Sequence, residues 1–108
     1  MPDFQTIANV GEIAEGRGRA FVVGDYVVGV YLVDGRYYAI NDFCPHMGAS
    51  LADGELEGPA VTCPLHAWRF DVRDGTWLDA KTIKTESFEV RVVGEEIQVA
   101  TAPRGKGR

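Results

Sequence analysis

Residues 44–66 read CPHMGASLADGELEGPAVTCPLH, and this stretch contains both cysteines and both histidines of the 108-residue chain. They stand as Cys44-x-His46 and Cys63-x-x-His66, with sixteen residues between the two phrases. Thiolate and imidazole groups bind zinc and iron, and four of them satisfy one tetrahedral ion or hold one two-iron cluster. The concentration of all four in two short phrases predicts a metal site.

The spacing of the four residues bears on which metal they hold. Structural zinc sites usually take two ligands from one turn with roughly two to four residues between them. Cys63-x-x-His66 meets that spacing, whereas Cys44-x-His46 has a single intervening residue. In a two-iron cluster the irons are held apart by sulfides, so each phrase can send its cysteine to one iron and its histidine to the other. The spacing therefore favours a two-iron cluster, and zinc remains the alternative.

The segments on both sides of this stretch are rich in β-forming residues. Gly24-Asp25, Asp34-Gly35 and Gly94-Glu95 separate these segments, and such pairs are typical of two-residue hairpin turns. We expect strands at 19–23, 26–33, 36–40, 87–93 and 96–100. The chain is therefore predicted to be mainly β, a small antiparallel sandwich.

Two of these segments carry more detailed expectations. In the run 87–93 the apolar residues Phe88, Val90 and Val92 alternate with polar ones, which predicts one buried and one exposed face. Residues 9–16 are the one segment that could hold a helical turn, and they are too short for much more.

The segment 42–80 interrupts the strand pattern. It contains three of the five prolines and several Asp-Gly or Glu-Gly turns, with short strands expected at 60–63 and 67–72. We expect a small site-bearing subdomain here, carried on the β platform. Residues 1–102 then form a single domain, and the Gly- and Pro-bearing residues 103–108 a disordered tail.

The chain has a formal net charge of −5. Its last eight residues carry three bases and no acid, so the remainder has 8 bases against 16 acids. An acidic body argues against nucleic acid and suits a basic docking face on a protein partner, although it also simply aids solubility. No apolar run approaches the roughly 20 residues that span a bilayer, and no leader is visible. We expect a cytoplasmic monomer that binds neither nucleic acid nor a membrane.

Residues 44–49 and 63–70 resemble the two cluster-binding boxes of Rieske proteins, and the stretch DGELEGPAVTCPLHAWRFDVRDG is similar to small Rieske ferredoxins. The resemblance covers roughly residues 3–100 and implies a Rieske-like antiparallel β-sandwich platform with a cluster-binding subdomain. It further implies one [2Fe-2S] cluster as cofactor. In that family the cysteines hold the inner iron and the histidines the outer, redox-active iron. The residues at those positions are Cys44, Cys63, His46 and His66.

The resemblance implies a one-electron carrier rather than an enzyme, which passes electrons from a flavoprotein reductase to a terminal oxygenase. The chain also resembles the small subunit of assimilatory nitrite reductase, including its ending FEVRVVGEEIQV. That resemblance implies an alternative, a redox subunit partnered by the large subunit. A third reading is a zinc-stabilised interaction module without a redox role.

The residues around the two boxes imply a low reduction potential. Rieske proteins of cytochrome complexes carry a disulfide that joins the boxes, and Ala49 and Leu65 stand in those places here. Those proteins also have a serine and a tyrosine whose hydroxyls donate hydrogen bonds to cluster sulfurs. Trp68 and Phe70 stand at these two positions here, and neither has a hydroxyl. Without these donors the reduced cluster is less stable. The expected reduction potential therefore lies at the low end of the range for Rieske clusters, near roughly −150 mV. The family's covering proline loop also has no counterpart in LDAKTIKTESFEV.

Other chemically suggestive residues have plainer explanations. Trp68 and Trp77 are more readily explained by packing than by an electron path. Glu55 and Glu57 are expected to be solvated side chains in a Gly-rich turn region rather than an acid–base pair.

Overall fold

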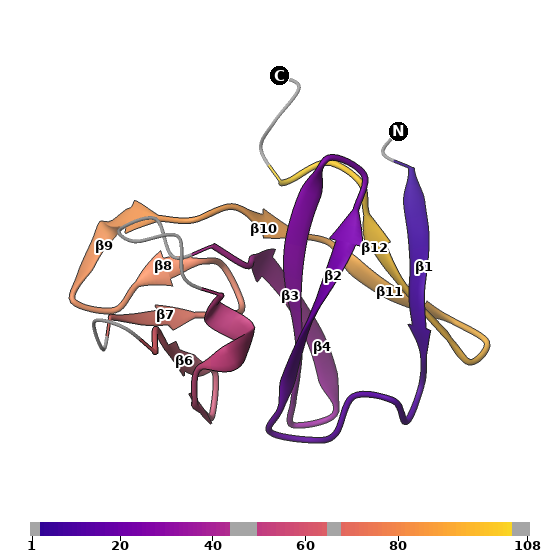
Figure 1. Ribbon diagram of the computed structural model, residues 1–108, viewed down its shortest axis with the longest axis horizontal. Helices are drawn as coiled ribbons and strands as arrows, with labels where there is room; N and C mark the ends of the chain where they lie inside the picture. Colours follow the sequence, from indigo (N-terminus) through magenta and orange to yellow (C-terminus); the bar gives the residue numbers. More distant parts are fainter. Residues whose placement is uncertain (1–2, 44–49, 65–67, 105–108) are drawn as a thin grey trace.

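The structure is a computed structural model that describes residues 3–43, 50–64 and 68–104. Within these ranges the chain forms twelve strands and one short 3-10 helix, without an α-helix. The strands make three antiparallel sheets (Figure 1). The mainly β prediction is confirmed. No helix in these ranges is long and apolar enough to cross a membrane.

The central sheet has the strand order β10-β4-β3-β2. Its members are β2 (Gly18–Val23), β3 (Tyr26–Val33), β4 (Arg36–Asn41) and β10 (Ser87–Phe88). The predicted hairpins are confirmed, and Val33 pairs with Arg36 across the Asp34-Gly35 turn. Asp34 and Gly35 have φ angles of 51° and 78°, as a type I′ turn requires at both central positions.

The second sheet has the order β1-β12-β11 and covers one face of the central sheet. Its members are β1 (Phe4–Asn9), β11 (Val90–Val93) and β12 (Glu96–Ala100). Between the two sheets lies a first core of apolar side chains from both: Ala8, Ile13, Val23, Val28, Val30, Ala39, Phe88, Ile97 and Val99. These two layers are the predicted sandwich platform.

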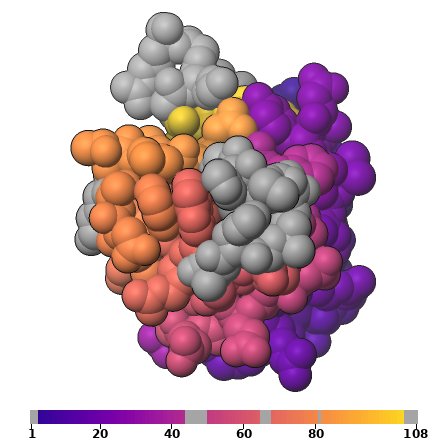
Figure 2. Space-filling view, turned by 60° about the vertical axis from the view of Figure 1, so that its left-hand side comes forward, coloured from indigo at the N-terminus to yellow at the C-terminus, as the bar shows by residue number. Residues whose placement is uncertain are grey.

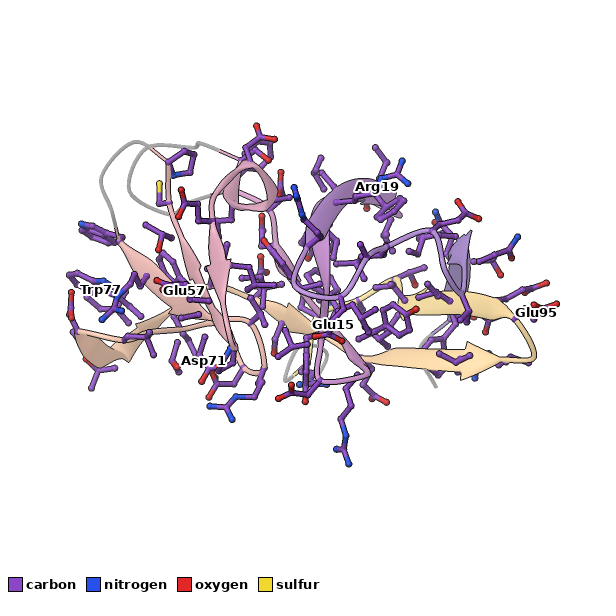
Figure 3. All side chains as sticks on the ribbon, turned by 90° about the horizontal axis from the view of Figure 1, so that it is seen from below. Glu15, Arg19, Glu57, Asp71, Trp77 and Glu95 are labelled. Atoms are coloured by element: carbon purple, nitrogen blue, oxygen red, sulfur yellow. The ribbon has the colours of Figure 1, made fainter. Side chains whose placement is uncertain are left out.

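The predicted strand 87–93 is wrong as a single element. It divides at Glu89, because Phe88 pairs with Ala39 in the central sheet whereas Val90 pairs with Val99 in the second sheet. The predicted buried face also fails in part, since Phe88 is 1% exposed but Val92 is 48% exposed. The hairpin of β11 and β12 runs beyond the core to a tip near Glu95, at the opposite end of the molecule from Trp77 (Figure 3).

Residues 9–16 form a turn instead of a helical segment. The amide of Glu12 donates to the carbonyl of Asn9 at 3.1 Å, and a second turn follows, in which the amide of Arg17 donates to the carbonyl of Ala14 at 3.1 Å. Glu15 then forms an isolated parallel bridge to Leu32, and its carboxylate accepts the amides of Asp34 and Gly35 at 2.7 and 3.0 Å. This segment therefore braces the β3–β4 turn, a contact that helix propensity does not reveal.

The third sheet has the order β5-β6-β7-β8-β9 and lies beside the sandwich (Figures 1 and 2). Its members are β5 (Leu56–Glu57), β6 (Ala60–Thr62), β7 (Arg69–Asp71), β8 (Thr76–Trp77) and β9 (Ala80–Lys84). The short strands expected at 60–63 and 67–72 are confirmed as β6 and β7. A 3-10 helix, η1 (Leu51–Asp53), precedes the sheet.

A second core joins the third sheet to the outer face of the central one. It contains Tyr31, Val33, Ile40, Leu51, Val61, Cys63, Phe70 and Val72. Because β3 sends Val28 and Val30 to the first core and Tyr31 and Val33 to the second, it is buried on both faces. The candidate site thus rests on the most buried strand of the platform.

The described residues of the predicted tail, Pro103 and Arg104, contact the rest of the domain. Pro103 is buried, and the amide of Arg104 donates to the carbonyl of Ser87 at 2.8 Å. The Arg104 guanidinium donates to the carbonyl of Arg73 at 3.2 Å. Pro103 and Arg104 therefore contact the domain, while 105–108 lie outside the described ranges; the domain boundary at residue 103 stays a prediction.

Candidate functional site

The residues on the two sides of the first predicted ligand phrase are paired with each other. Phe43 and Ser50 form an antiparallel bridge, and the amide of Leu51 donates to the carbonyl of Asp42 at 2.6 Å. The loop between these positions, 44–49, carries Cys44 and His46 and lies outside the described residues. Both ends of this six-residue loop are therefore held together by backbone bonds.

The second ligand phrase lies between β6 and β7. The amide of Cys63 donates to the carbonyl of Trp68 at 2.7 Å, which closes the loop 64–67 at its base. Cys63 is a free cysteine and is 1% exposed. His66 lies outside the described residues, whereas Pro64 is exposed. The described residues on the two sides of each ligand phrase are thus joined by backbone hydrogen bonds.

The two loop bases share one core. Leu51 at the end of the first loop and Cys63 at the start of the second are both buried in the second core. The backbone of Gly54 lies so close to the carbonyl of Thr62 that a Cβ at residue 54 would clash with it. Only glycine permits this approach, which brings the end of η1 against the residue before Cys63.

The metal-binding capacity of the described residues alone is limited. No three His, Cys, Asp or Glu side chains within 3–43, 50–64 and 68–104 are grouped closely enough to hold a metal ion. The predicted quartet combines the buried thiol of Cys63 with three residues outside those ranges: Cys44, His46 and His66. Two thiols and two imidazoles are the donor set of a histidine-ligated two-iron cluster.

Comparison with known proteins decides the family. Residues 3–89 match the Rieske [2Fe-2S] domain. The chain belongs to the Rieske [2Fe-2S] domain family. Its cofactor is accordingly a [2Fe-2S] cluster, and two thiols with two imidazoles are the ligand set of such a cluster when histidine binds one iron.

Relatives of this Rieske domain include components of oxygenase systems. The ferredoxin component of the naphthalene 1,2-dioxygenase system of Pseudomonas aeruginosa is 36% identical over 82% of this chain and 86% of that protein. A chain in the solved complex of reduced oxygenase and oxidized ferredoxin of carbazole 1,9a-dioxygenase is 31% identical, with a TM-score of 0.86. This alignment covers 94% of our chain and 95% of that one.

A different kind of protein shares the fold equally well. A structure described as the small subunit of an NADH-dependent nitrite reductase from Mycobacterium tuberculosis is 25% identical, with a TM-score of 0.86. The alignment covers 93% of this chain and 96% of that one. The fold class predicted from sequence is confirmed by these structures.

The surroundings of Cys63 in the Rieske domain are apolar. Phe70 is fully buried on β7 and belongs to the same core as Cys63, with Trp68 packed against that core. The rings of Trp68 and Phe70 lie 6.4 Å apart at an angle of 39°. Neither side chain has a hydroxyl, so the tuning hydrogen bonds of high-potential Rieske proteins have no donor at these two positions.

The two tryptophans of the chain form a stacked pair on the third sheet. Their ring centroids are 3.9 Å apart and their planes differ by 11°. The indole nitrogen of Trp77 is buried and makes no hydrogen bond. A buried N–H without a partner is destabilising by roughly 1–3 kcal/mol. The burial and stacking of the two rings offset this cost. This geometry agrees with the packing role expected for both residues.

Tyr31 presents a second buried polar atom without a partner, its phenolic oxygen. Burial is the main cause that raises the pKa of Tyr31, and the negative charges of Asp42 and Asp53 raise it further. The phenol therefore stays neutral in the folded protein under all ordinary conditions. Because Tyr31 belongs to the second core, it connects the platform strand β3 to the core around Cys63.

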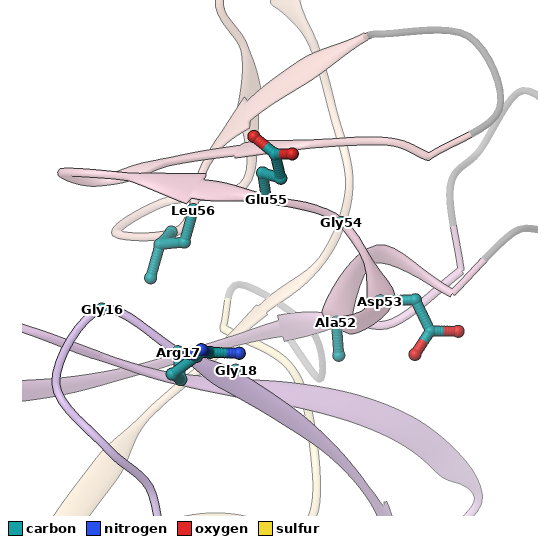
Figure 4. Close-up of a pocket in the computed structure, with 8 residues that line it drawn as sticks. All are labelled: Gly16, Arg17, Gly18, Ala52, Asp53, Gly54, Glu55 and Leu56. Atoms are coloured by element: carbon teal, nitrogen blue, oxygen red, sulfur yellow. The ribbon is translucent and has the colours of Figure 1, made fainter.

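A pocket of about 430 Å³ opens between the start of β2 and the segment η1–β5. Figure 4 shows Arg17 on one wall and Asp53 and Glu55 on the other, with the two carboxylates directed away from the guanidinium. These acidic groups do not converge, and Glu55 and Glu57 are exposed. The prediction that Glu55 and Glu57 are solvated side chains is confirmed.

Sequence reasoning missed the residues that support the loop bases. Asp42, Ser50 and Gly54 lie within or beside the ligand stretch but belong to no ligand pattern. Their importance follows from contacts between segments, and no local spacing signals such contacts. The aspartate directly before Phe43-Cys44 is the one feature that could have drawn attention, because a buried acid needs polar partners.

Proposed function

We propose that this chain is a one-electron carrier that takes electrons from a flavin-dependent reductase and delivers them to a terminal oxygenase. The observation that best supports the proposal is the shared base of the two ligand-bearing loops, where Leu51 and Cys63 meet in one core. The relatives named as ferredoxin components of oxygenase systems support the same role. The ferredoxin and oxygenase of carbazole 1,9a-dioxygenase form a complex, which supports direct docking of this chain on an oxygenase.

In this proposal Cys44 and Cys63 bind one iron, and His46 and His66 bind the other. The cluster, when bound, supplies reversible one-electron chemistry without group transfer. Cys63 fits its part because its thiol is free and buried among apolar side chains. The hydrogen bond from its amide to Trp68 fixes the backbone on which the thiol stands.

The surroundings of the site favour a low reduction potential. Phe70 and Trp68 exclude water on their side of Cys63 and offer no hydroxyl to a sulfur atom. The acidic chain, with 16 Asp and Glu against 11 Lys and Arg, also opposes the added negative charge of reduction. Such a carrier is suited to an oxygenase and poorly suited to quinol oxidation.

The alternative proposal is a redox subunit of a nitrite reductase. It is supported by the likeness to the small subunit from Mycobacterium tuberculosis, whose TM-score equals that of the carbazole ferredoxin complex. In that case the partner is a large reductase subunit. For either role we retain the sequence-based predictions of a monomer and of a cytoplasmic location.

Analysis of the purified protein tests the cofactor assignment. We expect a red-brown protein with about two irons and two acid-labile sulfides per chain, and a reduced form with the low average g value of a histidine-ligated cluster. Cys44→Ser and Cys63→Ser should abolish assembly. A protein with one zinc and no sulfide would exclude the carrier, and a variant that keeps the native spectrum would remove that cysteine from the ligand set.

Two measurements separate the proposed partners. The chemically reduced protein, mixed without oxygen with a purified oxygenase of the naphthalene dioxygenase type, should be reoxidised at a rate that falls as salt is added, because opposite charges steer the encounter. Affinity purification from the native host should not retain a large nitrite reductase subunit. Stable retention of that subunit, with no transfer to any oxygenase, would favour the alternative.

A further inference from the structure

We propose that Asp42 is a positioning residue that ties together the two sides of the segment that carries Cys44 and His46; the inference rests on the proposed function for the identity of the ligands. Asp42 is 2% exposed and stands at the end of the central sheet, two residues before Cys44. The hydrogen bonds that it makes to the described residues all join it to segments other than β4. Four such bonds are described, and they connect the platform, the loop end and η1.

Two of these bonds involve the backbone of Asp42. Its amide donates to the carbonyl of Val27 at 2.9 Å, which anchors the residue to β3. Its carbonyl accepts the amide of Leu51 at 2.6 Å, on the far side of the loop 44–49. The backbone of Asp42 therefore ties the loop end to the most buried strand of the molecule.

The carboxylate of Asp42 makes the other two bonds. Its Oδ2 accepts the hydroxyl of Ser50 at 2.5 Å, and its Oδ1 accepts the amide of Ala52 at 2.9 Å. One charged side chain thus binds both residues that flank Leu51. These two bonds add a side-chain link to the backbone bonds that join Asp42 to the residues after the segment 44–49.

The short helix η1 depends on this carboxylate for its start. Ser50 precedes η1, but its side chain makes no capping bond within its own segment. The free amide at the second position of the helix, Ala52, is bound by Asp42 instead. Asp42 precedes the segment 44–49, and its carboxylate caps the helix that follows that segment. The start of η1 is therefore tied to the residue before the segment.

This arrangement bears on the metal ligands because Cys44 and His46 lie between the points that Asp42 joins. The loop 44–49 can present two ligands with fixed geometry only if its ends cannot separate. Buried residues that orient ligands through hydrogen bonds commonly control metal retention without touching the metal. We therefore expect Asp42 to control how firmly the cluster is held.

The test compares four variants of the complete holoprotein. Asp42→Ala removes the carboxylate, and Ser50→Ala removes one of its donors. Ser50→Thr keeps the hydroxyl and serves as the conservative rescue. Asp53→Ala is the matched control, because it removes the same charge from an exposed position on η1.

Two readouts are followed for each variant: iron release to a ferrous chelator, and amide hydrogen exchange by mass spectrometry or NMR. Asp42→Ala should release iron about tenfold faster or more, and Ser50→Ala about threefold to tenfold faster. The amides of Leu51 and Ala52 should exchange faster by similar factors, while those of β3 stay protected. Ser50→Thr and Asp53→Ala should remain within about twofold of the wild type in both readouts.

The two readouts keep failure of this inference apart from failure of the proposed function. Equal iron release and equal exchange in Asp42→Ala and Asp53→Ala would overturn the positioning role. So would exchange that rises as much in β3 as at Ala52, since that result means general destabilisation. If Asp42→Ala does not fold, Ser50→Ala decides. A wild type without iron would refute the carrier, yet amide exchange would still test the loop closure.

Discussion

The indole rings of Trp68 and Trp77 stack face to face, 3.9 Å apart and 11° from parallel, although eight residues lie between them in the sequence. Trp68 directly precedes β7 and Trp77 ends β8, and the pairing of these two strands places Phe70 opposite Trp77. It covers the side of the second core next to the base of the second loop. The sequence has no proline between Trp77 and Pro103, where the family often has a proline-bearing loop over the cluster. In this chain the stacked tryptophans provide an apolar cover next to the second ligand phrase.

A double-mutant cycle measures how much the tryptophan pair contributes. We expect Trp68→Ala and Trp77→Ala each to lower the free energy of unfolding. The loss should be smaller than the roughly 3–5 kcal/mol typical of a fully buried aromatic residue, because both rings are only partly buried. The coupling between them should be about 0.5–1.5 kcal/mol. Urea unfolding of the holoprotein followed by circular dichroism provides the values. A coupling of zero would show that the rings pack independently.

Phe70→Tyr tests the low-potential assignment. The substitution adds one hydroxyl to a buried ring in the same core as Cys63. If this hydroxyl reaches the Cys63 sulfur, it adds one charge-assisted bond worth roughly 1.5–3 kcal/mol. Because 59 mV corresponds to a tenfold change for one electron, the midpoint should rise by some tens of millivolts, up to roughly 100. Spectroelectrochemistry of both proteins gives the difference.

Two outcomes of that experiment would contradict the assignment. A wild-type midpoint well above zero would exclude a low-potential carrier. An unchanged midpoint in Phe70→Tyr would mean that the ring edge points away from the cluster. Phe88→Tyr is a suitable control, since Phe88 is equally buried but belongs to the first core.

Tyr31→Phe should be neutral or stabilising at neutral pH. The Tyr31 hydroxyl is buried without a partner, and relief from such an atom is worth up to about 1–2 kcal/mol. The pKa of Tyr31 is raised in the folded protein above its ordinary value of 10.0, so the unfolded chain loses this proton first as pH rises. Stability contributed by the neutral phenol is thus present below pH 10 and is lost above it.

The variant should not show that alkaline loss. We expect the difference in unfolding free energy between Tyr31→Phe and wild type to grow as pH rises above about 10. Urea midpoints between pH 8 and 11, roughly, measure this difference. A wild-type curve parallel to that of the variant across this range would contradict the buried neutral phenol.

Truncation of the C-terminus locates the end of the folded domain. Removal of 103–108 deletes buried Pro103 and the Arg104 bonds to Ser87 and Arg73, and should lower the unfolding free energy by about 1–3 kcal/mol. Removal of 105–108 is the matched control and should change the midpoint little, since its composition predicts disorder. Equal stability of both truncated proteins would show that Arg104 does not anchor the segment.

The candidate ligands and most strands could be predicted from local patterns. Asp34-Gly35 forms its turn because the backbone there needs positive φ at two successive residues, a requirement written in the turn residues themselves. Cys44, His46, Cys63 and His66 stood out because soft ligands are rare and were confined to two phrases. Family membership confirms the cofactor, while the part of each residue in binding it stays a prediction.

Other features were decided by the tertiary structure. The run 87–93 divides at Glu89 because two different sheets offer partners to its two ends, and Val92 is exposed because its hairpin extends past the core. The role of Asp42 likewise depends on Ser50 and Ala52 being brought to it by the packing of Leu51. The residues of a turn and the chemical type of a metal ligand are local properties. The sequence by itself is therefore enough to determine them. Partner choice between sheets and across a loop depends on which surfaces bury each other, and only the folded chain settles that.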